Sequence, residues 1–392
     1  LSWARTSFWT VAQPTPQFEA MSENVLLKDQ LFNPLSVGRL ASEYSSALPQ
    51  FDAERFQRVA LGGFPERELM ARMEWLSDCI EAQLSCDFNV MADELEAAMP
   101  PPLSIEKSDN DFGHFIHGIP GILAVRHGLK THRERAMQLL YRATQRFSME
   151  FYIRAFLIHW PAETLKDLHE WAEDDHYHVR RLVSEGTRPK LPWAKAVGLA
   201  PDQTFPLLDK LHGDPTRYVT RSVANHMNDL SKSVPDLVIE RLGSWQKEAA
   251  QTQKELDWMT RHALRTLVKS GQGGALEMLG FKPDLPLDVD LTLETPEVRI
   301  GELLAFSCSI ASAALVKLLV DYRIEFARPG NRPAQKVFKL KQGRVGPCAP
   351  FDIRKEHLLK ADATTFTWHP GTHKLVLQVN GADRASAFFK VV

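Results

Sequence analysis

Apolar residues recur at spacings of three and four from about residue 25 to residue 280, broken by short turns rich in proline, glycine and aspartate. This period is typical of amphipathic helices, so we expect the whole stretch to be helical. Beyond residue 281 the pattern changes to short alternating runs, which predict β-strands. Asn380-Gly381 separates two such runs and indicates a tight hairpin. The pattern therefore predicts a helical part followed by a small β-sandwich.

One apolar frame with an arginine at its centre occurs four times in the helical part. The four arginines are Arg154, Arg181, Arg221 and Arg261. The last three are 40 residues apart, and the first lies 27 residues before the second. A helical unit repeated at about this interval is typical of an α-solenoid, in which neighbouring helix pairs bury each other's apolar faces. A row of arginines on such a surface suits a polyanion better than a small molecule.

These patterns divide the chain into three segments. Residues 1–21 show no helical period, and we expect a disordered leader or upstream sequence there. Residues 22–281 form the repeat domain, and residues 282–392 form the β-sandwich domain. Within the repeat domain, residues 99–111 contain three consecutive prolines and are expected to be a linker.

Charge is distributed unevenly along the chain. The formal net charge is -2, but residues 1–130 carry -8, whereas residues 131–282 and residues 283–392 carry +3 each. The repeats are therefore mildly basic, which permits a polyanionic partner.

Composition excludes several classes of function. The four cysteines and the scattered histidines lack metal-ligand spacing, so we expect neither a zinc site nor a disulfide framework, and reduced thiols fit a cytoplasmic protein. No apolar run is long enough to span a membrane. Motifs for phosphoryl transfer, dinucleotide binding and α/β-hydrolase chemistry are absent, and we expect no cofactor.

A run of unusual composition, SEGTRPKLPW at residues 184–193, follows the second arginine frame. Gly186 is expected to end a helix, after which Arg188, Lys190 and Trp193 lie on a loop stiffened by prolines. One interpretation is a rigid connector in which Trp193 packs between repeats. The other is a binding element, whose Arg188 meets a phosphate and whose Trp193 stacks on a sugar or base.

Three carboxylates lie near the arginine frames. Glu150 and Glu185 are each four residues from a frame arginine, and Asp229 lies eight residues beyond one. These spacings place each carboxylate on or near the helix face of its arginine. Intrahelical ion pairing is the simplest explanation. The alternative is that carboxylates on a basic surface keep their charge and stabilise a developing cation.

The run Val179–Trp193 and the run Arg221–Lys232 resemble the characteristic sequences of the bacterial AlkC branch of the AlkC/AlkD alkylpurine DNA glycosylases, and the resemblance extends over nearly the whole chain. It implies an all-α HEAT-like repeat solenoid followed by a small all-β immunoglobulin-like sandwich. It also implies excision of 3-methyladenine and 3-methylcytosine from double-stranded DNA, without base flipping. We therefore expect a monomeric, metal-free, monofunctional glycosylase of the bacterial cytoplasm, associated with the nucleoid during repair.

The resemblance also implies roles for single residues. Glu150, Glu185 and Asp229 are the expected catalytic carboxylates, which stabilise an oxocarbenium-like sugar and position a water molecule. Contacts to phosphates and to the lesion nucleotide are expected from Arg154, Arg181, Arg188, Lys190, Arg221, Trp160, Trp171 and Trp193.

Two alternatives from other classes of function are a non-catalytic HEAT-repeat scaffold and a structure-specific DNA-binding protein.

Overall fold

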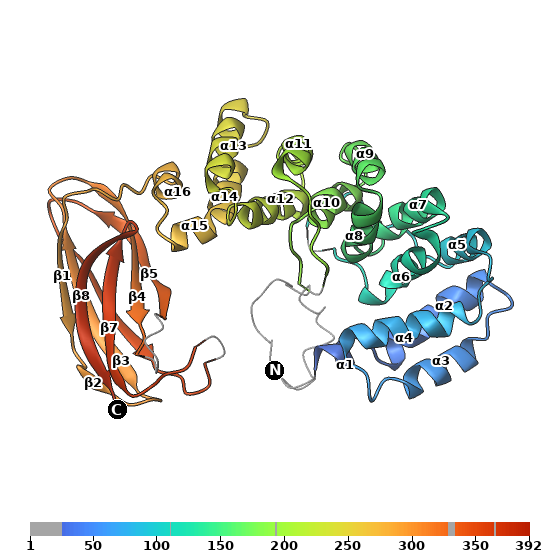
Figure 1. The fold of residues 1–392 in the computed structure, drawn as a ribbon, viewed down its shortest axis with the longest axis horizontal. Helices are drawn as coiled ribbons and strands as arrows, with labels where there is room; N and C mark the ends of the chain where they lie inside the picture. The colour runs from blue at the N-terminus through green and yellow to red at the C-terminus, as the bar shows by residue number, and fades with distance from the viewer. Residues whose placement is uncertain (1–25, 110, 193, 328–333, 364–365) are drawn as a thin grey trace. The chain divides into compact units, whose positions relative to one another are not determined.

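The computed structural model describes residues 26–109, 111–192, 194–327, 334–363 and 366–392. The expected leader, residues 1–21, lies outside the described residues. The described chain is helical up to residue 278 and forms β-strands from residue 288 onward (Figure 1). The predicted fold class, helices followed by a β-sandwich, is confirmed.

The helical part begins with short, irregular helices and continues with regular helix pairs. In the described part of the chain, no helix is both long and apolar enough to cross a membrane. In chain order the helices are α1 (Leu27–Leu31), α2 (Pro34–Ala47), α3 (Ala53–Gly62), α4 (Leu69–Glu81), α5 (Phe88–Ala97), α6 (Ile119–Leu123), α7 (Arg133–Thr144), α8 (Glu150–His159), α9 (Pro161–Trp171), α10 (Tyr177–Gly186), α11 (Pro201–Leu211), α12 (Arg217–Leu230), α13 (Pro235–Glu248), α14 (Gln253–Ala263), α15 (Arg265–Lys269) and α16 (Gly273–Met278).

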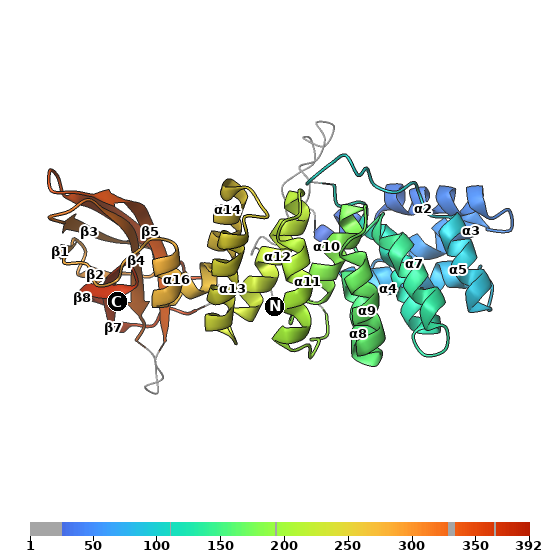
Figure 2. The same ribbon diagram turned by 90° about the horizontal axis from the view of Figure 1, so that it is seen from above.

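Ion pairs link each regular helix pair to the next. Figures 1 and 2 show α9 and α11 side by side in one row, with α10 and α12 in a second row. Arg133 of α7 reaches Asp167 of α9 at 2.5 Å, and Arg180 of α10 reaches Asp214, just before α12, at 2.6 Å. Both pairs span 34 residues, so they fix the offset between successive repeats more than they add net stability.

The inner helices α8, α10 and α12 pack closely on their apolar faces. Val179, Val183, Val219 and Val223, which flank the frame arginines, are fully buried. A Cβ atom at Gly186 would lie 2.6 Å from Cγ2 of Ile153, so glycine at the end of α10 permits its approach to α8. The side chains that follow Gly186 are thereby brought next to α8.

The C-terminal strands form two sheets with the orders β1-β3-β6 and β2-β8-β7-β4-β5. Adjacent strands are antiparallel except β2 and β8, which are parallel. The aromatic residues Phe306, Tyr322, Trp368 and Phe389 are buried in the core of the sandwich. The strands are β1 (Asp288–Leu293), β2 (Glu297–Val298), β3 (Leu303–Ala311), β4 (Val316–Glu325), β5 (Gln335–Val345), β6 (Phe351–Leu358), β7 (Gly371–Val379) and β8 (Ala382–Val391).

The described residues group into two compact units that cut across the helical part. The last helices belong with the sandwich, because Phe281, which follows α16, packs against Leu319 of β4. One unit comprises the described residues up to Leu230 together with Glu248–Met259, and the other comprises Ser231–Lys247 and Thr260–Val392.

The hairpin between β7 and β8 turns at Asn380 and Gly381, whose φ angles are 52° and 79°. The hairpin predicted from this dipeptide is therefore confirmed. Asn380 is fully buried, and its side-chain oxygen accepts a hydrogen bond from the N–H of Leu319 at 2.8 Å. Its Nδ2 donates to the carbonyls of Lys282 and Lys317 at 2.9 and 3.1 Å. One side chain thus joins the turn to β4 and to the segment after α16.

We expect Asn380→Ala to lower the free energy of unfolding of the sandwich unit by about 3 kcal/mol, because buried backbone groups lose partners and alanine is strained at positive φ. Chemical denaturation of the wild type and the variant measures the loss. Thr372→Ala, at an exposed position of β7, is the matched control. A loss below about 1 kcal/mol would show that the three side-chain bonds are dispensable.

Candidate functional site

Three carboxylates and two guanidiniums from adjacent helices meet in a buried cluster, hereafter the carboxylate cluster. Its members are Glu150 at the start of α8, Arg181 and Glu185 on α10, Arg188 just after α10, and Asp229 in the last turn of α12. Between 6% and 11% of each side chain is exposed. Charges removed from water to this extent are costly unless they are paired. The structure therefore brings together all three carboxylates that the arginine frames singled out.

Glu150 and Arg181 join α8 to α10. Oε2 of Glu150 accepts hydrogen bonds from Nη1 of Arg181 and, at 2.8 Å, from the hydroxyl of Ser148. The Ser148 oxygen in turn accepts from Arg181 at 2.6 Å. The Arg181 guanidinium also lies over the ring of Tyr218, 4.7 Å from its centroid. Burial raises the pKa of Glu150, and the neighbouring Arg181 acts in the opposite direction.

Glu185 is the central carboxylate of the cluster. Its Oε1 accepts from Arg188 at 2.5 Å, while its Oε2 accepts from the hydroxyl of Ser222 at 2.6 Å and lies 3.5 Å from Arg181. Burial alone would raise the pKa of Glu185, but the two guanidiniums and the Ser222 hydroxyl lower this pKa to about 2. Glu185 is therefore ionised at neutral pH, with donors on both oxygens.

Arg188 extends the cluster to the third helix. Its Nε and Nη2 both donate to Oδ2 of Asp229, at 2.8 and 2.7 Å. Because its Nη1 binds Glu185, a single guanidinium connects the carboxylates of α10 and α12. Such charge-assisted bonds are shorter and stronger than bonds between neutral groups. The loop that carries Arg188 thus determines how Glu185 and Asp229 lie relative to each other.

Arg154 has backbone partners. Its side chain is 1% exposed, and its guanidinium donates to carbonyl oxygens at the end of α10 and in the loop that follows. The distances are 3.0 Å to Gly186, 2.7 Å to Arg188, 3.3 Å to Pro189 and 2.8 Å to Lys195. The expected phosphate contacts of Arg154, Arg181 and Arg188 stay predictions, and in this structure their guanidiniums have partners inside the protein.

Arg221 is the most exposed of the four arginines expected to contact phosphates, at 29% of its side chain, and it pairs with Asp109 at 2.5 Å. Asp109 belongs to the segment expected to be a linker. The carbonyl of Ser108 in the same segment accepts from the N–H of Tyr218 at 3.1 Å. The segment therefore contacts α12. Sequence reasoning missed this contact because its partners are 112 residues apart and share no pattern.

Trp160 and Trp171, the two predicted tryptophans that the structure describes, do not join the carboxylate cluster. Nε1 of Trp160 donates to the carbonyl of Leu129 at 2.7 Å. Because Trp160 follows the last residue of α8, it lies about 15 Å along the helix from Glu150. Trp171, at the end of α9, packs against Tyr141 with 5.5 Å between ring centroids. Their contacts to a lesion nucleotide stay predictions.

The loop between α10 and α11 carries the two remaining predicted residues. Lys190 is exposed on this loop, where a phosphate can reach it. Trp193 lies outside the described residues.

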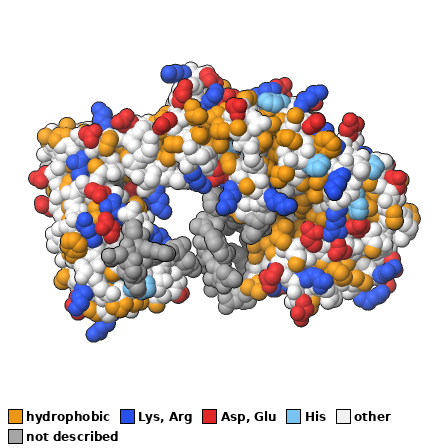
Figure 3. Space-filling model, in the orientation of Figure 1, with side chains coloured by type: hydrophobic (Ala, Val, Ile, Leu, Met, Phe, Trp, Pro, Cys, Tyr) orange, Lys and Arg blue, Asp and Glu red, His pale blue; other side chains and the backbone are white. Residues whose placement is uncertain are grey.

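On the face of the protein shown in Figure 3, acidic and basic side chains are interspersed over the N-terminal helices. Among the described residues, no group of histidine, cysteine or acidic side chains is arranged to hold a metal ion.

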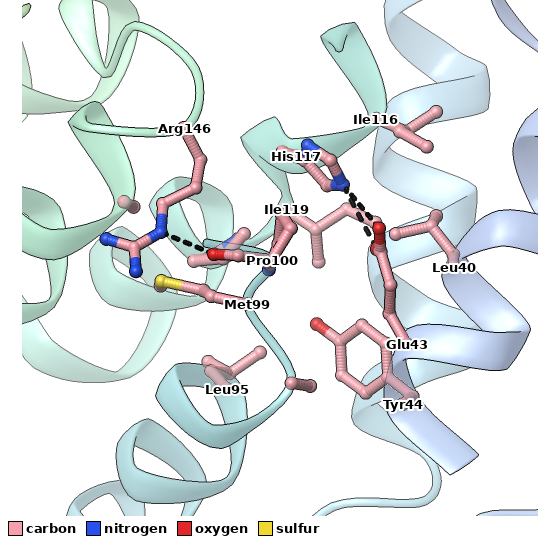
Figure 4. A pocket seen from close by; sticks show the side chains of 13 residues that line it. Leu40, Glu43, Tyr44, Leu95, Met99, Pro100, Ile116, His117, Ile119 and Arg146 are labelled. Atoms are coloured by element: carbon pink, nitrogen blue, oxygen red, sulfur yellow. Dashed lines mark hydrogen bonds and ion pairs between the residues drawn. The ribbon is translucent and has the colours of Figure 1, made fainter. Parts of the chain in front are cut away.

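A small cavity lies among the N-terminal helices (Figure 4). His117 Nε2 faces Glu43 at 3.0 Å, and Arg146 Nε donates to the carbonyl of Pro100 at 2.8 Å. The volume of about 10 Å³ suffices for one water molecule and not for a nucleobase. No member of the carboxylate cluster is among the lining residues, which are Leu40, Glu43, Tyr44, Leu95, Ala98, Met99, Pro100, Ile116, His117, Ile119, Pro120, Ala143 and Arg146.

Two known proteins are similar to this chain over almost their whole length. The chain is 31% identical to the uncharacterized protein YhaZ of Bacillus subtilis (strain 168) over 371 residues, which are 92% of this chain and 98% of that protein. Residues 288–392 match the family model described as the C-terminal Ig-like domain of YhaZ. Among solved structures, the Pseudomonas fluorescens alkylpurine DNA glycosylase AlkC, bound to DNA containing an abasic site analog, superposes with a TM-score of 0.80. It shares 33% identity and covers 93% of this chain and 99% of its own.

His226, one turn before Asp229, makes the stability of the site depend on pH. It is fully buried, with Nδ1 donating to the carbonyl of Ser184 at 3.0 Å. Burial, together with the charge of Arg188, lowers the pKa of His226 to about 4. The unfolded chain binds this proton near pH 6.5. Stability contributed by the neutral imidazole is therefore present above about pH 6.5 and declines as the pH falls toward 4.

We expect His226→Asn to weaken this pH dependence, because the asparagine amide can keep the bond to Ser184 without titrating. Between pH 7 and pH 5 the wild type should lose about 2 kcal/mol more of its free energy of unfolding than the variant does. Urea denaturation at a series of pH values measures the difference. His159→Asn, at an exposed position of α8, should follow the wild type. Identical pH profiles for wild type and His226→Asn would contradict the assignment.

Proposed function

The chain belongs to the AlkC-type family, and we propose from this membership that it is an alkylpurine DNA glycosylase. It hydrolyses the N-glycosidic bond of cationic N3-alkylated bases, 3-methyladenine and 3-methylcytosine, in double-stranded DNA and so initiates base excision repair. The observation that carries the proposal is the carboxylate cluster, in which three acidic side chains from α8, α10 and α12 meet. The family resemblance implies these same three residues as the catalytic carboxylates.

The charges of the cluster suit this reaction. An N3-alkylated base is already cationic, so it can leave as a neutral base without a proton from the enzyme. Positive charge then develops on the deoxyribose, where fixed anions stabilise it. The groups in direct contact comprise three carboxylates and two guanidiniums, so the carboxylates outnumber the guanidiniums by one. Attack of water at the sugar C1′ completes the hydrolysis, and a carboxylate accepts the proton that water releases.

The contacts of the carboxylates suggest a division of roles. Glu185 has donors on both oxygens and a pKa lowered to about 2, which make it a poor base and a good electrostatic anchor. Glu150 and Asp229 are the proposed residues for orienting and activating the water. Water is the nucleophile in this scheme, so the reaction is monofunctional and leaves an abasic site.

The proposed partner is duplex DNA. Of the described Lys and Arg residues expected to contact DNA, Lys190 is exposed and Arg221 is partly exposed, so these two are the most accessible to phosphates. Trp193 on the same loop as Lys190 would pack on the lesion nucleotide. Contact to the sugar edge, without extrusion of the base, requires no base-sized pocket. We further propose that the protein acts as a metal-free monomer in the bacterial cytoplasm and associates with the nucleoid during repair.

We expect the purified protein to release base from duplex DNA that contains 3-methylcytosine and to leave an abasic site whose strand breaks only on alkaline treatment. Glu150→Gln and Asp229→Asn should each lower the single-turnover rate by about 100-fold or more, because each removes one fixed charge near the sugar. Glu173→Gln, which removes a carboxylate 69% exposed just after α9, is the matched control and should keep the wild-type rate.

The two alternatives give different outcomes in the same experiment. A non-catalytic scaffold would release no base above the level of the Glu150→Gln/Asp229→Asn double variant. A structure-specific binder would in addition prefer branched junctions to linear duplex and ignore the lesion. Either outcome would refute the glycosylase proposal.

A further inference from the structure

The segment between α10 and α11, residues 187–200, has neither helix nor strand among its described residues. Its backbone carbonyls therefore need partners outside regular secondary structure. One side chain of α8, Arg154, serves three of them as well as the carbonyl of Gly186 at the end of α10. This concentration of backbone acceptors on one buried guanidinium is the feature from which the inference starts.

We propose that Arg154 is a positioning residue for the glycosylase reaction. It holds the loop after α10, so that Arg188 fixes the positions of Glu185 and Asp229. The proposal rests on the proposed function and deepens it. It assigns Arg154 a role different from the expected phosphate contact, because the residue acts through Arg188 and does not touch DNA.

The geometry of the bonds requires a guanidinium. Nε of Arg154 donates to Lys195, Nη1 donates to both Gly186 and Arg188, and Nη2 donates to Pro189. These acceptors span ten residues of chain and lie around one planar fork of five N–H groups. A lysine ammonium carries the same charge but presents three donors from a single atom, so it cannot reproduce the fork.

A short path of contacts leads from Arg154 to the carboxylates. The carbonyl of Arg188 accepts from Arg154 at 2.7 Å, which fixes the backbone of that residue. Its side chain then reaches Glu185 at 2.5 Å and Asp229 at 2.7 Å. If the loop is released, Arg188 loses its anchor, and the two carboxylates lose the cation that holds them at one distance.

Burial separates this role from DNA binding. Arg154 is 1% exposed, so a phosphate could reach its guanidinium only after the loop had moved away. Lys190, on the same loop, is exposed and serves as the comparison residue for a phosphate contact. Burial and the charge of Arg188 lower the pKa of Arg154 to about 10, which still leaves the side chain charged at neutral pH.

The test uses the full-length protein with Arg154→Lys, Arg188→Lys and the double variant. We expect Arg154→Lys to lower the single-turnover excision rate by about 100-fold, the scale of a misplacement of about 1 Å in an active site. Its affinity for lesion-free duplex should stay within a factor of about three, and the slope of log affinity against log salt should not change. Lys190→Ala should lower that slope by about 0.9 and keep more of the rate.

The double variant tests whether Arg154 acts through Arg188. Two residues on one path give non-additive losses, so we expect the double variant to be no slower than the slower single variant. Multiplied losses would overturn the proposal. A wild-type rate in Arg154→Lys, or a reduced salt slope in that variant, would overturn it as well.

Hydrogen exchange without DNA gives a readout that does not depend on catalysis. The backbone amides of Thr187, Arg188, Lys190 and Leu191 should exchange faster in Arg154→Lys than in the wild type, while those of α2 should not change. Faster exchange combined with no base release by the wild type would reject the glycosylase proposal and keep only the role of Arg154 in holding the loop. Unchanged exchange in a folded Arg154→Lys protein would reject the positioning role alone. Global unfolding of that variant would show a general structural role and overturn the proposal.

Discussion

The inner surface of the helical repeats depends on one electrostatic constraint, which is that carboxylates buried between helices must be paired. Glu150 and Glu185 are 4% and 5% exposed as whole residues, and burying such charges costs several kcal/mol per ion when they lack partners. Arg181 lies between these two carboxylates and pairs with both. The offset of α8 relative to α10 is therefore set by an ion pair as well as by apolar packing.

Small side chains make this pairing sterically possible. Gly186 lets α8 approach the end of α10, where a Cβ atom would meet Ile153. The hydroxyl oxygens of Ser184 and Ser222 lie 3.1 Å apart between α10 and α12. Because both side chains are small, the Ser222 hydroxyl is close enough to donate to Glu185. Close helix packing and charge pairing thus depend on the same few positions. A larger side chain at any of them would separate the charges and leave them buried without partners, which is energetically unfavourable.

The sequence predicted the helical repeats and the β-sandwich, and it singled out the three carboxylates that lie together in the structure, because each leaves a local signal of period or spacing; the catalytic role of the carboxylates stays a prediction. It could not predict the partners of Arg154, since carbonyl oxygens belong to every residue and carry no sequence signature. Arg188 and Asp229 are 41 residues apart, so the sequence gives no sign that they pair. From the sequence alone, Arg188 on a loop near other arginines was equally consistent with a phosphate contact. Burial decides between such alternatives, and burial follows from packing that a single sequence does not show.

The pairing also limits the chemistry that the site can perform. Burial alone would raise the pKa of Glu185, but its guanidinium and hydroxyl neighbours lower this pKa to about 2. Glu185 therefore carries no proton at neutral pH and cannot act as a general acid. An unmodified purine is a poor leaving group and needs such an acid, whereas an N3-alkylated base is already cationic and leaves as a neutral base when it takes the electron pair of the glycosidic bond. A site whose central carboxylate cannot donate a proton therefore favours bases that are already cationic, and this selectivity needs no base-recognition pocket. The ion pairs that stabilise the fold would then be the same ones that restrict the proposed substrate.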